Sequence, residues 1–150
     1  MAATCLAKPD LTRLVRRQLG SLICDDSGAA ADGTALYWLA DPRDLQQIRY
    51  VGQTKSPRRR YLQHLSTARL WLPDERPWWI ASPKLRPLYE WIRELHREDF
   101  RLPAMIISAW VPTTEQARVA ERTRILECLE QHLPLLNFER ETLGRQIPLL

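Results

Sequence analysis

The residues best suited to chemistry on a phosphodiester lie close together in this chain, between Tyr37 and His64. Tyr37 and Tyr50 stand in two short apolar segments, and Arg60 and His64 follow at a spacing of four. Residues four apart project from one face of a helix, so Arg60 and His64 are expected to act at the same place. A guanidinium grips a phosphate at two oxygens, and a histidine exchanges protons near neutral pH. The pattern therefore favours a site for phosphodiester hydrolysis.

A carboxylate that could complete such a site stands far away in the sequence, at Glu121. It shares a stripe at helical spacing with Ala117, Ile125 and Cys128. A carboxylate among small apolar residues suits one Mg²⁺ or Mn²⁺ ion, because a hard cation accepts one carboxylate together with water and phosphate oxygens. A phenol has a reference pKa of ~10, so Tyr37 needs Arg60 and this metal ion nearby to act as a base.

Apolar periodicity and turn residues predict the elements that must position these side chains. The order of elements predicts an α+β fold: a small three-stranded, mainly antiparallel sheet flanked by helices, with an extra N-terminal helix. The predicted elements are an amphipathic helix within residues 1–24, strands at Ala35–Leu39 and Ile48–Val51 joined by a long hairpin loop, a helix from Ser56–Pro57, a loop over 72–83, a helix from Ser82–Pro83, a buried central strand at Ala104–Val111, and a helix from the cap Thr113 to about Gln131.

Composition narrows the class of protein. The net charge is +4 with a pI near 9.2, and most of the basic residues are arginines. This composition favours a polyanionic partner, although a genome-wide bias toward arginine produces the same composition. No apolar run approaches the ~20 residues of a membrane span, and the N-terminus lacks the apolar core of a secretory signal, so a cytoplasmic location is expected. Three cysteines without a CxxC pair argue against disulfides and zinc.

The order and the spacing of these residues resemble those of the GIY-YIG endonuclease family. The two tripeptides that give the family its name correspond here to 35–37 (ALY) and 50–52 (YVG). The arginine and histidine of the following helix correspond to Arg60 and His64, the helical glutamate to Glu121, and the closing asparagine to Asn137. The ordered set is far more specific than either tripeptide alone. In this chain alanine replaces the first glycine, and the longer spacer between the tyrosines is expected to place a long hairpin loop near the site.

The resemblance implies a metal-dependent DNA endonuclease that uses one Mg²⁺ or Mn²⁺ ion held at Glu121 and leaves a 5′-phosphate and a 3′-hydroxyl. Tyr37 would position or deprotonate the attacking water, with Tyr50 beside it. Arg60 would bind the scissile phosphate, His64 would accept the proton from Tyr37, and Asn137 would hold the geometry. The residues expected to contact nucleic acid are Gly52, Gln53, Thr54, Lys55, Arg58 and Arg59.

The resemblance also divides the chain into an N-terminal helical extension and linker (1–33), a nuclease domain (34–138) and a C-terminal tail (139–150). No DNA-reading motif is present, so target choice would come from DNA structure, from a homodimer or from a protein partner. No membrane partner is expected.

Structural alternatives exist for each feature taken singly. A strand tyrosine usually packs in a core, an arginine run usually lies on a solvated face, and Trp78 and Trp79 plug the domain surface more often than they stack on bases. The alternative function is a catalytically silent GIY-YIG-like module that binds nucleic acid or another protein.

Overall fold

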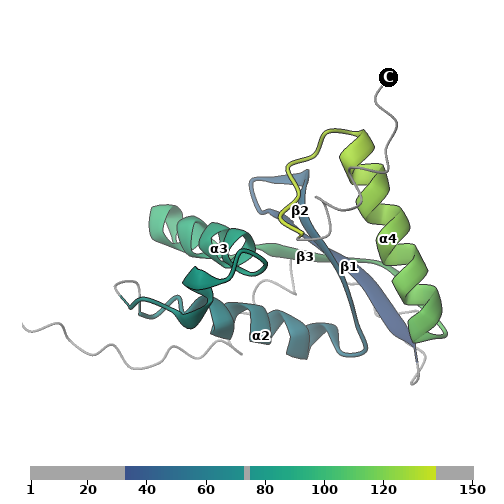
Figure 1. The fold of residues 1–150 in the computed structure, drawn as a ribbon, viewed down its shortest axis with the longest axis horizontal. Helices are drawn as coiled ribbons and strands as arrows, with labels where there is room; N and C mark the ends of the chain where they lie inside the picture. Colours follow the sequence, from purple (N-terminus) through teal and green to yellow (C-terminus); the bar gives the residue numbers. More distant parts are fainter. Residues whose placement is uncertain (1–32, 73–74, 138–150) are drawn as a thin grey trace, which may run out of the picture.

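The computed structural model describes residues 33–72 and 75–137, which form an α+β unit of one sheet with helices on both of its faces (Figure 1). This confirms the predicted fold class. The predicted N-terminal helix and the 139–150 tail lie outside the described residues. In chain order the elements are β1 (Thr34–Asp41), β2 (Asp44–Thr54), α2 (Pro57–Ala68), the 3-10 helix η2 (Trp78–Ala81), α3 (Arg86–Asp99), β3 (Ala104–Val111) and α4 (Thr114–Glu130).

The sheet has the strand order β2-β1-β3, and both pairings are antiparallel. The prediction that Ala104–Val111 forms the central strand was wrong, because β1 occupies the centre and β3 lies at an edge. Only the first two residues of β3 are buried, and Ser108 and Ala109 are exposed. A continuous apolar run does not by itself distinguish a central strand from an edge strand that a helix covers in part.

The hairpin between β1 and β2 turns tightly at Pro42 and Arg43, so the predicted long loop was also wrong. Asp41 pairs with Asp44, and the Asp41 carboxylate accepts hydrogen bonds from the backbone N–H and the guanidinium of Arg43 at 2.9 and 3.0 Å. The extra residues lengthen both strands and are absorbed by register shifts on either side of Ala40. The extra residues between the two tyrosines therefore lie near the hairpin turn, several residues away from Gly52.

Alternation along β1 gives each face of the sheet its own core. The α2–α3 face carries Tyr37 and Leu39 against helices α2 and α3, whereas the α4 face carries Leu36 against α4. Figure 1 shows α2 and α3 on one side of the strands and α4 on the other. Buried residues on the α2–α3 face include Tyr61, Leu65, Trp79, Ile92 and Met105; those on the α4 face include Val51, Ile125, Cys128 and Leu135.

The helix ends follow local chemistry. The first residue of α2 is Pro57, as predicted, and the Thr113 hydroxyl caps α4 by accepting from the Gln116 N–H at 3.1 Å. In contrast, α3 begins at Arg86 rather than at Ser82–Pro83, since the Ser82 hydroxyl accepts from the Leu85 N–H at 3.3 Å and holds this segment in a turn.

The predicted loop over 72–83 contains η2, which carries both tryptophans. The Trp79 side chain is fully buried, and its indole N–H donates to the carbonyl of Thr67 at 2.7 Å, which confirms the packing interpretation for this residue. Trp78 is 65% exposed. None of the helices in the described segments has both the length and the apolar character that a bilayer span requires.

Candidate active site

Tyr37 occupies the middle of the central strand, directly opposite Gly52 on β2. Its ring leans across the neighbouring strand, so a Cβ atom at position 52 would lie only 2.6 Å from the Tyr37 hydroxyl oxygen. Gly52 is therefore required for space rather than for an unusual backbone conformation, and no other residue type fits under the phenol without displacing it.

The buried imidazole of His64 links Tyr37 to a second phenol. The Tyr37 hydroxyl lies 2.9 Å from His64 Nε2, and His64 Nδ1 lies 3.3 Å from the hydroxyl of Tyr89 on α3. Tyr89 does not stand out in the sequence, because it lies on the apolar stripe of its helix and resembles an ordinary core residue. With Nε2 accepting from the Tyr37 hydroxyl, the Nδ1 proton of His64 is the one that faces the Tyr89 oxygen.

Tyr50 and Arg60 complete the cluster on the α2–α3 face. The Tyr50 ring centroid lies 6.3 Å from that of Tyr37 and 5.5 Å from that of His64. Arg60, one helical turn before His64, places its guanidinium within hydrogen-bonding reach of the Tyr37 hydroxyl, and it also donates to Gln63 Oε1 at 3.4 Å. The structure thus brings together the four residues of the 37–64 segment that the sequence singled out.

Burial dominates the protonation of this cluster. Desolvation and the neighbouring Tyr50 raise the pKa of Tyr37 far above its usual value, although Arg60 opposes the shift. Desolvation and the positive charge of Arg60 lower the pKa of His64 from 6.5 to about 3. Both groups are therefore neutral at pH 7, so Nε2 holds a lone pair and the Tyr37 O–H donates to it.

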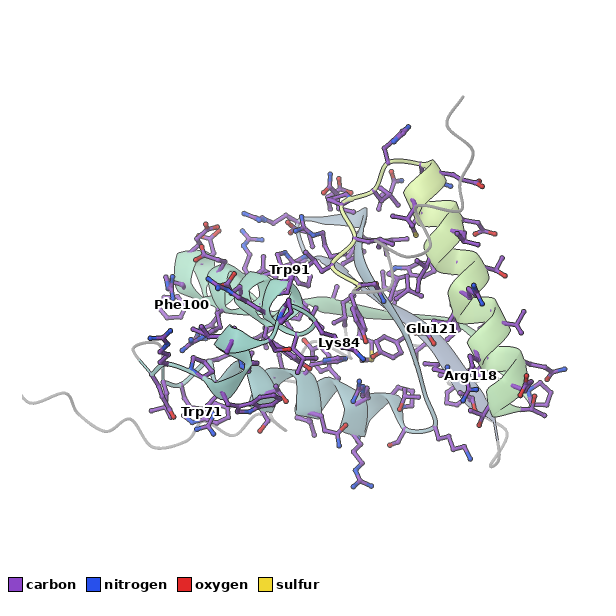
Figure 2. The ribbon with its side chains drawn as sticks, viewed as in Figure 1. Trp71, Lys84, Trp91, Phe100, Arg118 and Glu121 are labelled. Carbon is purple, nitrogen blue, oxygen red and sulfur yellow. The ribbon has the colours of Figure 1, made fainter. Side chains whose placement is uncertain are left out.

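Glu121 reaches the same region from the other face of the sheet. Its carboxylate accepts a hydrogen bond from Gln53 Nε2 at 2.8 Å. Burial raises the pKa of Tyr50, and the negative charge of Glu121 adds to this rise. Figure 2 shows Glu121 directed from α4 towards the strands. The predicted carboxylate thus lies beside β2, close enough to Tyr50 to affect its pKa.

The side chains around Glu121 offer the type of ligand atom, oxygen, that a hard cation binds. The side-chain oxygen of Gln53, Oε1, is buried and lacks a hydrogen-bond partner, and it belongs to the amide that contacts the carboxylate. Amide and carboxylate oxygens are among the ligands that Mg²⁺ or Mn²⁺ prefers. Among residues 33–72 and 75–137, no three histidine, cysteine, aspartate or glutamate side chains gather at one point. Glu121 and Gln53 would therefore leave most coordination positions to water and substrate oxygens.

Asn137 acts on the backbone of β2 rather than entering the cluster. Its side-chain oxygen accepts from the Val51 N–H at 2.9 Å, and its amide nitrogen donates to the Val51 carbonyl at 2.8 Å. Both bonds are buried, and they anchor the segment after α4 to the residue between Tyr50 and Gly52. This geometry is consistent with a positioning role.

The remaining residues expected to contact nucleic acid lie where β2 passes into α2. The side chains of Lys55, Arg58 and Arg59 are exposed, and the Thr54 hydroxyl accepts from the Ser56 N–H at 3.1 Å. Gln53 points instead to Glu121. The exposed cations therefore lie at one side of the buried cluster: Arg58 and Arg59 directly precede Arg60 on α2, and Lys55 stands just before the helix.

Comparisons of this chain with protein-family models, with curated proteins and with solved structures gave no match. The fold and the site define the chain as a small α+β protein with a neutral tyrosine–histidine–tyrosine chain beneath an arginine, and with a glutamate at the adjoining sheet edge.

Proposed function

We propose that this protein is a metal-dependent DNA endonuclease that hydrolyses phosphodiester bonds in the manner of the GIY-YIG family that its sequence resembles. The observation that carries the proposal is the convergence of Tyr37, Tyr50, Arg60 and Glu121 from four elements. Glu121 stands about sixty residues after Arg60 in the sequence, and packing alone does not require a half-buried arginine, two phenols and a carboxylate to meet.

Arg60 is the group that would bind the scissile phosphate. Its guanidinium lies against the Tyr37 hydroxyl, so a phosphate held in its fork stands next to the phenol oxygen. An anion at this place offsets the positive charge of Arg60 and adds a negative charge of its own. Substrate binding therefore raises the pKa of His64 from its low value in the empty site.

Proton transfer would run through Tyr37 without a standing phenolate, which refines the expectation that Tyr37 serves as a simple base. As the attacking water transfers a proton to the Tyr37 oxygen, the phenol proton moves to His64 Nε2 over the 2.9 Å hydrogen bond. The water oxygen forms the new bond to phosphorus, the bond to the 3′ oxygen breaks, and solvent protonates the leaving oxygen. Tyr37 ends each transfer neutral, as its raised pKa requires.

Glu121, with Gln53 beside it, would hold a single Mg²⁺ or Mn²⁺ ion. When bound, such an ion stabilises negative charge on the phosphoryl and leaving oxygens. Lys55, Arg58 and Arg59 would contact neighbouring phosphates, which position DNA without reading its sequence.

Nicking of supercoiled plasmid in Mg²⁺ or Mn²⁺ tests this proposal. Arg60→Ala is expected to lower the rate by roughly 10² to 10³-fold, and Tyr37→Phe and Glu121→Gln are expected to abolish nicking at equal amounts of folded protein. Glu130→Gln, an exposed glutamate on the same helix, is the matched control and should keep the wild-type rate.

If the wild-type chain does not nick DNA with either metal, the proposal that the protein is an endonuclease is wrong. Salt-sensitive DNA binding under those conditions would favour the catalytically silent binding module instead. Unchanged nicking by Glu121→Gln would remove the metal ligand from the proposal.

A further inference from the structure

Two groups of surface cations can be distinguished within residues 33–72 and 75–137. One group is neutralised by acidic neighbours on the same element or loop, in ion pairs of 2.7 to 3.3 Å. The pairs are Arg43–Asp41, Arg69–Glu75, Arg86–Glu90, Arg97–Glu94, Arg101–Asp99 and Arg124–Glu127. These pairs lie along the hairpin turn, the helix ends and the outer faces of the helices.

The second group has no such partner in the part of the chain that the structure describes. Apart from Arg76, in the loop before η2, its members flank the candidate site on two sides. Lys55, Arg58 and Arg59 lie at the start of α2, and Arg118 and Arg122 lie on α4. Only the first three are expected from the sequence to contact nucleic acid.

The α4 arginines stand on either side of Glu121. Arg118 precedes it by about one turn and Arg122 follows it directly, and Figure 2 shows Arg118 and Glu121 on the same part of the helix. Because Glu121 bonds Gln53, two residues before Lys55, the two groups of cations approach each other across the β2 edge.

Arg118 and Arg122 place two like charges on one face of α4, with Glu121 between them in the sequence. They stand at i and i+4, a spacing at which like charges on a helix repel each other. Glu115, one turn before Arg118, forms no ion pair with it, whereas elsewhere on the surface such neighbours are paired. A polyanion lying over this part of α4 would relieve the repulsion.

We propose that Arg118 and Arg122 form a second phosphate-binding row, so that double-stranded DNA crosses the β2 edge between them and the Lys55–Arg58–Arg59 row. The inference depends on the proposed function for the identity of the ligand. It adds that the backbone is held on both sides of the scissile linkage, by α2 on one side and by α4 on the other. Two rows of cations would fix the direction in which the DNA strand passes Glu121, whereas a single row would leave that direction open.

Binding of a fluorescent DNA duplex, measured at several salt concentrations in EDTA to prevent cleavage, tests the inference. Loss of two phosphate contacts is expected to reduce the slope of log K against log salt by about 1.8, since each contact to B-DNA contributes about 0.9. The double variant Arg118→Gln/Arg122→Gln should show this change and bind more weakly. The matched control Arg86→Gln/Arg97→Gln removes equal charge from ion-paired arginines on α3 and should keep the wild-type slope.

The outcomes separate the two proposals. If the wild-type chain shows no salt-dependent DNA binding, DNA is not the ligand of these cations, and the proposed function is wrong as well. A wild-type chain that binds DNA, with equal slopes for the α4 variant and the α3 control, would overturn the second row alone.

Discussion

The two faces of the sheet bury side chains of very different character. On the α2–α3 face, Tyr37, His64 and Tyr89 form a hydrogen-bonded chain within an aromatic core. On the α4 face the core is aliphatic around Leu36, Val51 and Ile125, and the polar side chain of Asn137 bonds only the backbone of β2. The same three strands thus support a polar interior on one side and an apolar one on the other.

This difference shows where the protein departs from simple packing. A buried ionisable group costs stability unless it is neutral or paired, and the α2–α3 face keeps His64 and two phenols neutral by burial. The core of the α4 face is aliphatic apart from the Cys128 thiol, and this face contributes to the site through Glu121, Gln53 and Asn137. We therefore expect substitutions in the aliphatic core of the α4 face to act through stability and those on the α2–α3 face to act through protonation and geometry.

The largest loss of stability is expected from truncation of the aliphatic core on the α4 face. Ile125→Ala should lower the free energy of unfolding by about 2 to 5 kcal/mol, because it leaves a cavity among well-packed neighbours. Urea unfolding measures this change. Val119→Ala, 61% exposed on the same helix, is the control and should stay within about 0.5 kcal/mol of wild type. Equal losses for both variants would contradict the assignment of the core.

Acid is expected to destabilise the α2–α3 face through His64. In the unfolded chain this histidine titrates near 6.5, whereas burial and Arg60 lower its pKa to about 3 in the fold. The unfolded state therefore binds the proton first, and the free energy of unfolding falls as the pH drops from about 6.5 towards 3, by up to about 1.4 kcal/mol per pH unit. Urea unfolding at successive pH values should show a shallower fall for His64→Gln than for wild type.

The exposed His132, replaced by asparagine, provides the control for this pH series and should follow the wild-type curve. Identical pH curves for wild type and His64→Gln would show that the buried imidazole does not control acid stability.

Gly52→Ala tests how closely the two strands approach at the site. The added methyl would lie 2.6 Å from the Tyr37 hydroxyl oxygen, so the phenol must move away from His64. We expect a loss of about 1 to 3 kcal/mol in stability together with loss of nicking by the folded fraction. Without the phenol, in a Tyr37→Ala background, the same substitution should cost much less, as a double-mutant cycle would reveal. Full activity of Gly52→Ala would show that Tyr37 need not lie over this glycine.

The smallest effect is expected from Tyr89→Phe. It removes the hydroxyl that faces His64 Nδ1 at 3.3 Å, a long hydrogen bond, so stability should fall by about 1 kcal/mol. Nicking should fall severalfold and shift in its pH profile, because the imidazole loses the contact that fixes its tautomer. Tyr61→Phe, which breaks the buried bond to the Pro103 carbonyl, is the control: it should lower stability but leave the pH profile unchanged.

The local sequence sufficed to predict the elements that carry the site. Apolar runs and turn residues predicted two strands with Tyr37 and Tyr50, Pro57 marked the start of α2, and Thr113 the start of α4. These features are local, since they depend on side-chain period, on proline at the first helical turn and on a capping hydroxyl. The spacing of Arg60 and His64 likewise predicted a shared helix face.

Tertiary structure alone decided which strand is central, how the hairpin turns and which residues complete the site. The edge position of β3 depends on pairing between segments far apart in the chain, which an apolar run does not encode. Tyr89 joins His64 because α3 packs beside α2, and Glu121 meets Gln53 because α4 crosses the opposite face of the sheet. The low pKa of His64 likewise arises only when these layers close and exclude water from an imidazole beside a guanidinium.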